Sequence, residues 1–296
     1  MEDLTNNTNL TQTILDTINQ LFNQLFSSID NSIYSTLDNL VFINPQILQD
    51  SLFEKLFGTS ASNGLLLIAN SLLISFTLFY CFKLLYSNFT GISVEQPYQF
   101  IFKLLLVGII MNSSYFICER MVYLNSLISS SICELGTLIF QKTISFSSLI
   151  QNLDSIISID GSSLNVFSFD GLLKSFISIS LFNLLFSYSL RYIMIKVFIL
   201  LTPFSFLTLI NSSTSWFFKM WFRTVFSLLI MQSFISIILL ITFSFSFQFS
   251  DTFSKLMCIG SIYALIRANS YIQQLIGGIS TDVSNHSNLT KLFLSR

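Results

Sequence analysis

Long apolar runs recur between residues 64 and 278, separated by shorter polar segments. A helix needs about 20 predominantly apolar residues to cross the roughly 30 Å hydrocarbon core of a bilayer. The sequence therefore predicts an all-α fold, a polytopic helical membrane protein with about five spans. The expected spans are at about residues 64–85, 100–118, 172–192, 224–247 and 256–276.

The segment before the first span, residues 1–63, has a different pattern. Between residues 9 and 42, apolar side chains recur at steps of three and four, which is the period of an amphipathic helix. Pro45 ends this pattern. A helix lying on anionic lipid headgroups normally carries basic residues, but none precedes Lys55. We therefore expect the apolar stripe to pack on protein, either the chain's own spans or a neighbouring subunit.

Residues 119–171 are richer in charge than the apolar runs around them, so we predict a large loop domain between spans two and three. Apolar residues from Leu124 to Ile139 keep a helical period, which makes this loop partly helical. Asp160-Gly161 indicates a turn. The charged residues are Glu119, Arg120, Glu134, Lys142, Asp154, Asp160 and Asp170.

The third apolar run is too long for one straight crossing, because it continues from residue 172 to residue 210. Pro203 lacks a backbone donor and is expected to kink or break the run. We predict a span followed by a short re-entrant or interfacial piece, within a unit of residues 172–278. Gly277 and Gly278 are expected to end the last helix, before a polar tail at 279–296.

Composition agrees with a lipid environment. Hydrophobic residues make up 52% of the chain and charged residues 10%, whereas soluble domains carry roughly 25% charged residues. So few charges cannot cover so much apolar surface in water. The net charge of -1 also excludes a global basic field that would attract nucleic acid.

Basic residues predict the orientation, because cytoplasmic loops carry more Lys and Arg. The region 191–223 has four such residues, whereas the longer segment 119–171 has two. We therefore expect the N-terminus and the loop domain outside, with 191–223 and the C-terminal tail in the cytoplasm. If residues 193–210 also cross the membrane, everything after them is inverted.

Nothing in the sequence indicates catalysis. His286 is the one histidine, and the four cysteines form no CxxC pair, so no metal or cofactor site is predicted. No phosphate-binding GxxxxGK[ST] loop occurs, and no paired intramembrane carboxylates indicate a proton relay. Cys118 and Cys133 flank one segment and can meet in an oxidising compartment.

Arg267 lies in the middle of the expected fifth span, where a charge is unfavourable unless it finds a partner or water. It is a candidate pore-lining or subunit-locking cation; the alternatives are a satisfied buried arginine and one that extends to the headgroups. Asn269, Gln273 and Gln274 continue the polar side of the same helix. Gln232, in the fourth span, is the candidate hydrogen-bond partner of Arg267.

The stretch 212–224 interleaves Trp216 and Trp221 with Lys219 and Arg223. Such a pattern can bind single-stranded nucleic acid through stacking and phosphate contacts. At the end of a span it more often anchors the protein at the membrane interface, and we favour the anchor.

Three stretches within residues 170–281 together resemble the TrbL-like family of conjugal transfer proteins. The first is the span with Arg191 followed by VFILLTPFSFLTLI at 197–210. The second is STSWFFKMWFRTVFSLLIMQSFISIILLI, and the third is IYALIRANSYIQQLIGGIST. The family comprises polytopic inner-membrane channel subunits of type IV secretion systems.

The resemblance implies a non-catalytic subunit that helps form the route for DNA and protein across the bacterial inner membrane. It further implies a homo-oligomer with other secretion-system membrane subunits and ATPases as partners, and transient contact with translocated single-stranded DNA. The alternative is the membrane subunit of a small-molecule permease or transporter. Transporters often have paired broken helices in their two halves, and the sequence indicates one break, at Pro203, without a counterpart.

Overall fold

The computed structural model describes residues 31–58, 64–91, 95–149, 169–245 and 252–276, with a few residues between 13 and 21. All regular elements in these ranges are helices, which confirms the all-α class. In order they are α2 (Asn31–Val41), η1 (Pro45–Ile47), α3 (Ser51–Phe57), α4 (Leu65–Thr90), α5 (Pro97–Asn112), α6 (Ser114–Phe140), α8 (Phe169–Leu200), α9 (Thr202–Leu207), η2 (Thr208–Ile210), α10 (Ser215–Ser244) and α11 (Thr252–Ile276).

Four of the described helices are long and apolar enough to cross a membrane: α4, α6, α10 and the Ile179–Leu200 part of α8. The 26 residues of α4 extend about 39 Å, against a hydrocarbon core of about 30 Å. The chain is therefore a multi-pass helical membrane protein. The set differs from the expected five spans, since α6 belongs to it, whereas α11 does not and α5, which covers most of the expected second span, is a shorter apolar helix. Polar side chains such as Arg267 and Gln273 make α11 less apolar.

The boundary expected at residue 118 falls inside a helix. The α5 helix ends at Asn112 and α6 begins at Ser114, so the joint at Ser113 replaces the predicted end of the second span. Backbone bonding continues across it, because Ser113 N donates to the Ile109 carbonyl at 3.0 Å and Ile117 N donates to the Ser113 carbonyl at 3.0 Å. Residues 119–140, expected in the loop domain, are therefore helical.

The charged residues of α6 are the reason why the sequence analysis assigned residues 119–140 to a loop domain. Arg120 and Glu134 are exposed, whereas Val122, Asn125 and Gly136 are buried on the other side of the same helix. The exposed side also carries large apolar residues such as Leu124 and Ile128. The scattered charges of α6 therefore resemble those of a loop domain when only its composition is considered.

The expected interruption at Pro203 is confirmed. The α8 helix runs past the predicted end at residue 192 and stops at Leu200, and α9 begins at Thr202 with Pro203 in its first turn. Proline is tolerated at that position because its missing donor would have no partner there. Pro203 is buried, so the short piece α9 packs inside the molecule.

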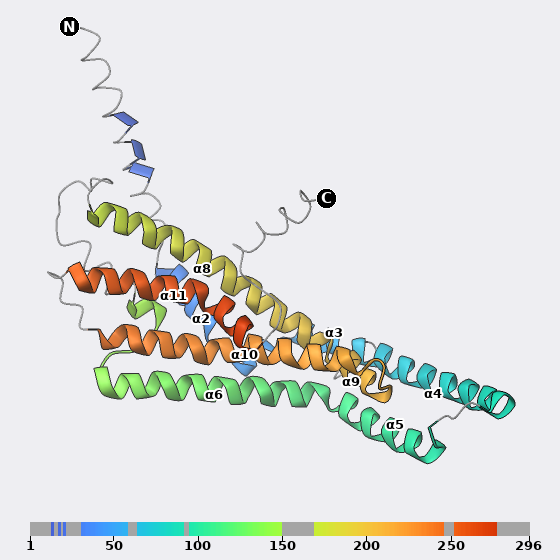
Figure 1. Ribbon diagram of the computed structural model, residues 1–296. Coiled ribbons are helices and arrows are strands. Elements are labelled where there is room, and N and C mark those ends of the chain that lie inside the picture. Colours follow the sequence, from blue (N-terminus) through green and yellow to red (C-terminus); the bar gives the residue numbers. More distant parts are fainter. Residues whose placement is uncertain are drawn as a thin grey trace, which may run out of the picture.

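The α10 helix forms the centre of the fold, where it packs against α6, α8 and α11 (Figure 1). The core has two parts. In the first, α2, α8, α10 and α11 meet around Tyr188 and Ile235. In the second, α3, α5, α6 and the ends of α8 and α10 meet around Phe57, Ile195 and Trp221.

The α4–α5 hairpin projects from one end of this bundle (Figure 1). Within α4, all of whose residues are described, Ala69 is the one buried residue. Different segments of the chain meet at the two opposite ends of the helical bundle. The hairpin tip lies beside residues 210–212, whereas α6 leads to residues 141–149 at the opposite end (Figure 1).

The C-terminal part of the amphipathic N-terminal stripe docks on its own chain. The α2 helix packs against α8, with Leu37 and Val41 in the core. Asp38 also joins α2 to the segment 141–149 that follows α6. Its carboxylate accepts hydrogen bonds from Phe146 N at 2.7 Å and Ser147 N at 3.2 Å. A neighbouring subunit is not needed to cover this part of the stripe.

Candidate functional site

Arg191 is the most unusual residue of the bundle, because its side chain is completely buried. Its Nε donates to the Leu228 carbonyl at 2.9 Å and its Nη1 to the Val41 carbonyl at 3.2 Å. Its Nη2 has no partner among the described residues, and no carboxylate of that part of the chain forms an ion pair with it. Arg191 thus joins α8 to α10 and α2.

Backbone dipoles compensate part of the charge of Arg191. Val41 is the last residue of α2, and the last carbonyls of a helix carry partial negative charge. A fully buried cation with this partial compensation is strongly disfavoured by desolvation. Arg191 therefore joins three helices, and its Nη2 group, which carries two N–H donors, has no acceptor among the described residues.

A ladder of polar side chains joins α6 to α10. Asn125 Nδ2 donates to Gln232 Oε1 at 3.1 Å, and Ser233 Oγ donates to Asn125 Oδ1 at 3.3 Å. One turn further, the hydroxyls of Ser129 and Ser236 are 2.7 Å apart. The expected bond between Gln232 and Arg267 is thus corrected, since the structure gives Gln232 a partner on α6. Buried polar groups pair with the nearest facing helix, and that helix is α6.

Arg267 is half-buried on α11. Its Nε donates to the Tyr263 hydroxyl at 3.3 Å, one turn earlier, and its guanidinium lies 5.7 Å from the Tyr263 ring centre. Of the polar residues expected beside it, Asn269 is buried and Gln274 is exposed. The Nε2 of Gln273 is buried and has no hydrogen-bond partner among the described residues.

Gly277 and Gly278 lie outside the described residues. The last described helix, α11, ends at Ile276, directly before them.

The aromatic and basic stretch divides between surface and core. Trp216 is 58% exposed, and Lys219 and Arg223 are exposed as well. Trp221, in contrast, is buried, and its Nε1 donates to the Phe198 carbonyl at 2.8 Å. Trp221 therefore fixes α10 to α8 and cannot stack with a nucleic-acid base, whereas Trp216 remains available as an interfacial anchor.

The pairing considered for Cys118 and Cys133 is corrected. Both cysteines are free and lie on α6, 133 − 118 = 15 residues apart, which is about 22 Å along a helix. A disulfide requires Cα atoms within about 7 Å. Cys118 instead lies 3.2 Å from the Thr202 hydroxyl, at the break between α8 and α9.

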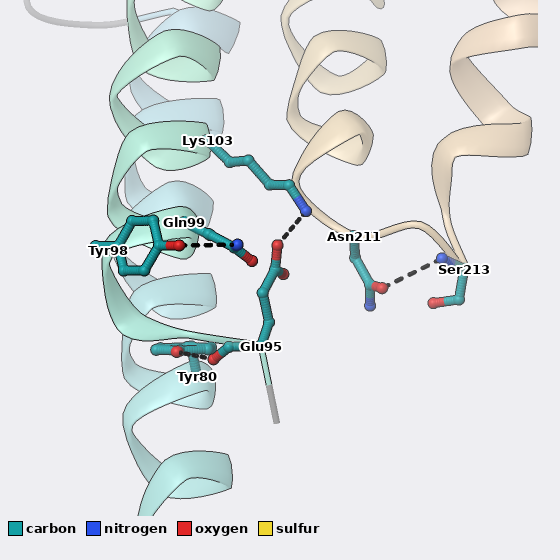
Figure 2. Close-up of polar contacts among 7 residues, drawn as sticks. All are labelled: Tyr80, Glu95, Tyr98, Gln99, Lys103, Asn211 and Ser213. Atoms are coloured by element: carbon teal, nitrogen blue, oxygen red, sulfur yellow. Dashed lines mark hydrogen bonds and ion pairs between the residues drawn. The ribbon is translucent and has the colours of Figure 1, made fainter. Parts of the chain in front are cut away.

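A cleft of about 240 Å³ lies at the tip of the α4–α5 hairpin, next to the loop before α10. Figure 2 shows Lys103 directed toward Glu95, with which it forms an ion pair, and Asn211 facing them from the loop. The Tyr80 hydroxyl donates to the Glu95 carbonyl at 2.7 Å. Asn211 Oδ1 accepts a hydrogen bond from Ser213 N at 3.2 Å, which fixes the amide.

Sequence reasoning missed the α6 side of the ladder and this cleft. Asn125, Ser129 and Gly136 are spaced by four and seven residues, which places them on one helical face, but they fell within the expected loop domain. Lys83 and Lys103 flank the hairpin tip in sequence, whereas Asn211 reaches it from more than a hundred residues away. No local pattern contains that contact.

The described residues contain no group of three or more His, Cys, Asp or Glu that could hold a metal ion. Comparison of the chain with protein-family models, with curated proteins and with solved structures found no match. A function must therefore be inferred from the structure alone. Its two informative features are the buried polar contacts between helices and the basic cleft at the hairpin tip.

Proposed function

We propose that the chain is a non-catalytic channel or scaffold subunit of a type IV secretion apparatus that transfers DNA and protein across the bacterial inner membrane. The main support for this proposal is the position of the residues that resemble the TrbL-like family. Arg191, Trp221 and Gln232 are all buried at contacts of α10 with its neighbours. Residues shared with such a family are expected to build the helix packing that its members have in common.

A second support is the unpartnered surface of the hairpin. Most residues of α4 are exposed within the chain, and apolar surface of this kind needs lipid or other subunits. We propose that further copies of the chain and other secretion-system membrane subunits share this role with lipid. Energy would come from partner ATPases, since the sequence has no phosphate-binding loop.

The proposed orientation has the N-terminus outside and the C-terminal tail in the cytoplasm, which requires α11 to cross the membrane in addition to the four long apolar helices. It follows from the excess of basic residues in 191–223 over 119–171. In this orientation the exposed Lys219 and Arg223 face the cytoplasm, where transient contact with single-stranded DNA is possible.

An in-frame deletion of the gene in a conjugating donor tests the proposal. Mating transfer should fall to background and return with a plasmid-borne wild-type copy, while relaxase cleavage at the transfer origin continues unchanged. Because cleavage precedes translocation, its persistence separates a channel defect from a processing defect. Unimpaired transfer in the deletion strain would reject the assignment.

One structural feature favours the permease alternative. The joint between α5 and α6 at Ser113 is a second helix interruption, and α9 packs against both of these helices. Cys118 and Thr202 connect the two interruptions directly. Paired broken helices are common at transporter sites. A deletion strain that mates normally but loses uptake of one nutrient would support this alternative.

A further inference from the structure

The cleft at the hairpin tip has an excess of positive charge. Its charged lining residues are Lys83, Glu95 and Lys103. Lys103 is paired with Glu95, whereas Lys83 forms no ion pair within the described part of the chain. One cationic side chain is thus left without a counter-ion, and an anionic group in the cleft would neutralise it.

Neutral donors complete the cleft on the side opposite the lysines. Asn211 and Ser212 line it from the loop between η2 and α10. The Oδ1 of Asn211 is held by Ser213 N, which leaves its Nδ2 to donate, and Ser212 contributes a hydroxyl. Two ammonium groups, an amide N–H and a hydroxyl form a donor set that matches a phosphate group.

The size of the cleft limits what it can enclose. Its volume of about 240 Å³ is below the roughly 300–1,000 Å³ of sites that bury a drug-sized molecule. A compact charged group fits, while the rest of such a ligand must lie outside. Phe76, Phe79 and Phe100 line the cleft as well, so the part that leaves it meets apolar surface.

The surroundings of this cleft are typical of a membrane interface. Large aromatic side chains around it are exposed on the two helices of the hairpin, and aromatic residues with nearby lysines are typical of the headgroup region. Basic pockets between spans are also places where anionic headgroups bind. The exposed aromatic residues are Phe79, Phe82, Tyr86, Phe89, Tyr98 and Phe102.

We propose that the cleft binds the phosphate of an anionic phospholipid, with Lys83 and Lys103 as the cationic ligands and the loop 211–212 as the neutral donors. The headgroup brings one net negative charge to a site with one net positive charge. A zwitterionic headgroup presents the same phosphate with its charge already compensated. The site therefore distinguishes phosphatidylglycerol from phosphatidylcholine. The inference requires a membrane protein but does not depend on the secretion role.

Binding to the purified full chain in detergent tests the proposal, with added phosphatidylglycerol, phosphatidylcholine or inorganic phosphate as probes and native mass spectrometry and thermal unfolding as readouts. Phosphatidylglycerol should bind and raise the unfolding temperature more than phosphatidylcholine. Lys83→Gln should weaken its binding about fivefold, because a basic residue near an anionic headgroup contributes about that factor. This variant breaks no ion pair of the described chain, so it is expected to fold.

One further variant is expected to change binding in the opposite direction, and another serves as a control. Glu95→Gln removes the competing carboxylate and should tighten phosphatidylglycerol binding, whereas Lys142→Gln, at the exposed opposite end, should leave it unchanged. Equal binding of both lipids, or a Lys83→Gln variant that binds as tightly as the wild type, would overturn the proposal. A shift produced by inorganic phosphate alone and lost in Lys83→Gln would overturn the lipid as the source of the phosphate.

Discussion

At the scale of single residues, Arg191 carries the sharpest energetic argument. Moving a cation out of water into an apolar bundle is unfavourable by several kcal/mol. Two backbone carbonyls offset part of this penalty, but the described residues supply no carboxylate that forms an ion pair with it. Stability alone therefore does not account for an arginine at this position, and we propose that a functional requirement does.

We expect Arg191→Met to leave the thermal unfolding midpoint unchanged or higher, because methionine fills a similar volume without the desolvation penalty. The same variant should reduce mating transfer severely if the cation is needed for function. Differential scanning fluorimetry of the purified protein and donor mating assays give the two readouts. A midpoint several degrees below that of the wild type would show that Arg191 is retained for stability.

The partner of Gln232 is the second question at this scale. Removing Gln232 leaves Asn125 Nδ2 buried without an acceptor. In a double-mutant cycle of Gln232→Leu and Asn125→Leu, we expect a coupling energy of about 0.6 kcal/mol, the typical value for hydrogen bonds between membrane helices.

The matched cycle of Gln232→Leu with Arg267→Leu should give a coupling near zero, since Arg267 instead donates to Tyr263. Unfolding in denaturing detergent measures both cycles. The reverse result, with coupling to Arg267 and none to Asn125, would contradict the packing of α6 on α10.

The sequence identified a few of the buried polar residues of the bundle but not their partners. Arg191, Gln232 and Asn269 were recognisable because polar groups are rare in apolar runs, and the structure buries all three. Their partners depend on which helices face each other. Both acceptors of Arg191 among the described residues are backbone carbonyls, which leave no trace in the sequence.

At the scale of helices, the contact between α6 and α10 depends on a small residue. A Cβ at Gly136 would lie 2.6 Å from Ile144 Cγ1 and 2.7 Å from Leu240 Cδ1. Both distances are too short for real contacts, so Gly136 lets α6 approach its neighbours closely. Small residues have this role at many helix interfaces in membranes.

Gly136→Ala should therefore destabilise the protein by about 1–3 kcal/mol, the usual effect of overpacking. Gly260→Ala on α11 is the control, because a Cβ there meets nothing within 4 Å, and it should stabilise the helix by roughly 0.5–1 kcal/mol. Thermal unfolding compares the two. If both substitutions stabilise, the close approach at Gly136 is wrong.

Helix boundaries were predictable where one strong local signal sets them. Pro203 interrupts α8 and α9 close to the expected position, and α4 covers the expected first span. The extent of α6 was not predictable in the same way. Its scattered charges resemble those of a loop domain until Asn125 and Gly136 are seen to face α10.

At the scale of the whole molecule, the long helices connect two opposite ends, and each end is formed by different segments of the chain. The hairpin tip and the loop 208–214 share one end, while residues 141–149 lie at the other (Figure 1). The sequence placed the first two segments on one side and the third on the opposite side, from its spans and basic residues alone. The packing of the ends agrees with that division, although which end faces the cytoplasm is a proposal.

Labelling of single cysteines in intact cells with a maleimide that does not cross the inner membrane tests the multi-pass arrangement most directly. Asn88→Cys, Ser212→Cys and Lys142→Cys place exposed thiols at the two ends, in a background without the four native cysteines. We predict labelling of Lys142→Cys in intact cells, and of Asn88→Cys and Ser212→Cys only after permeabilisation. Identical labelling of Ser212→Cys and Lys142→Cys would contradict a chain that crosses the membrane between them.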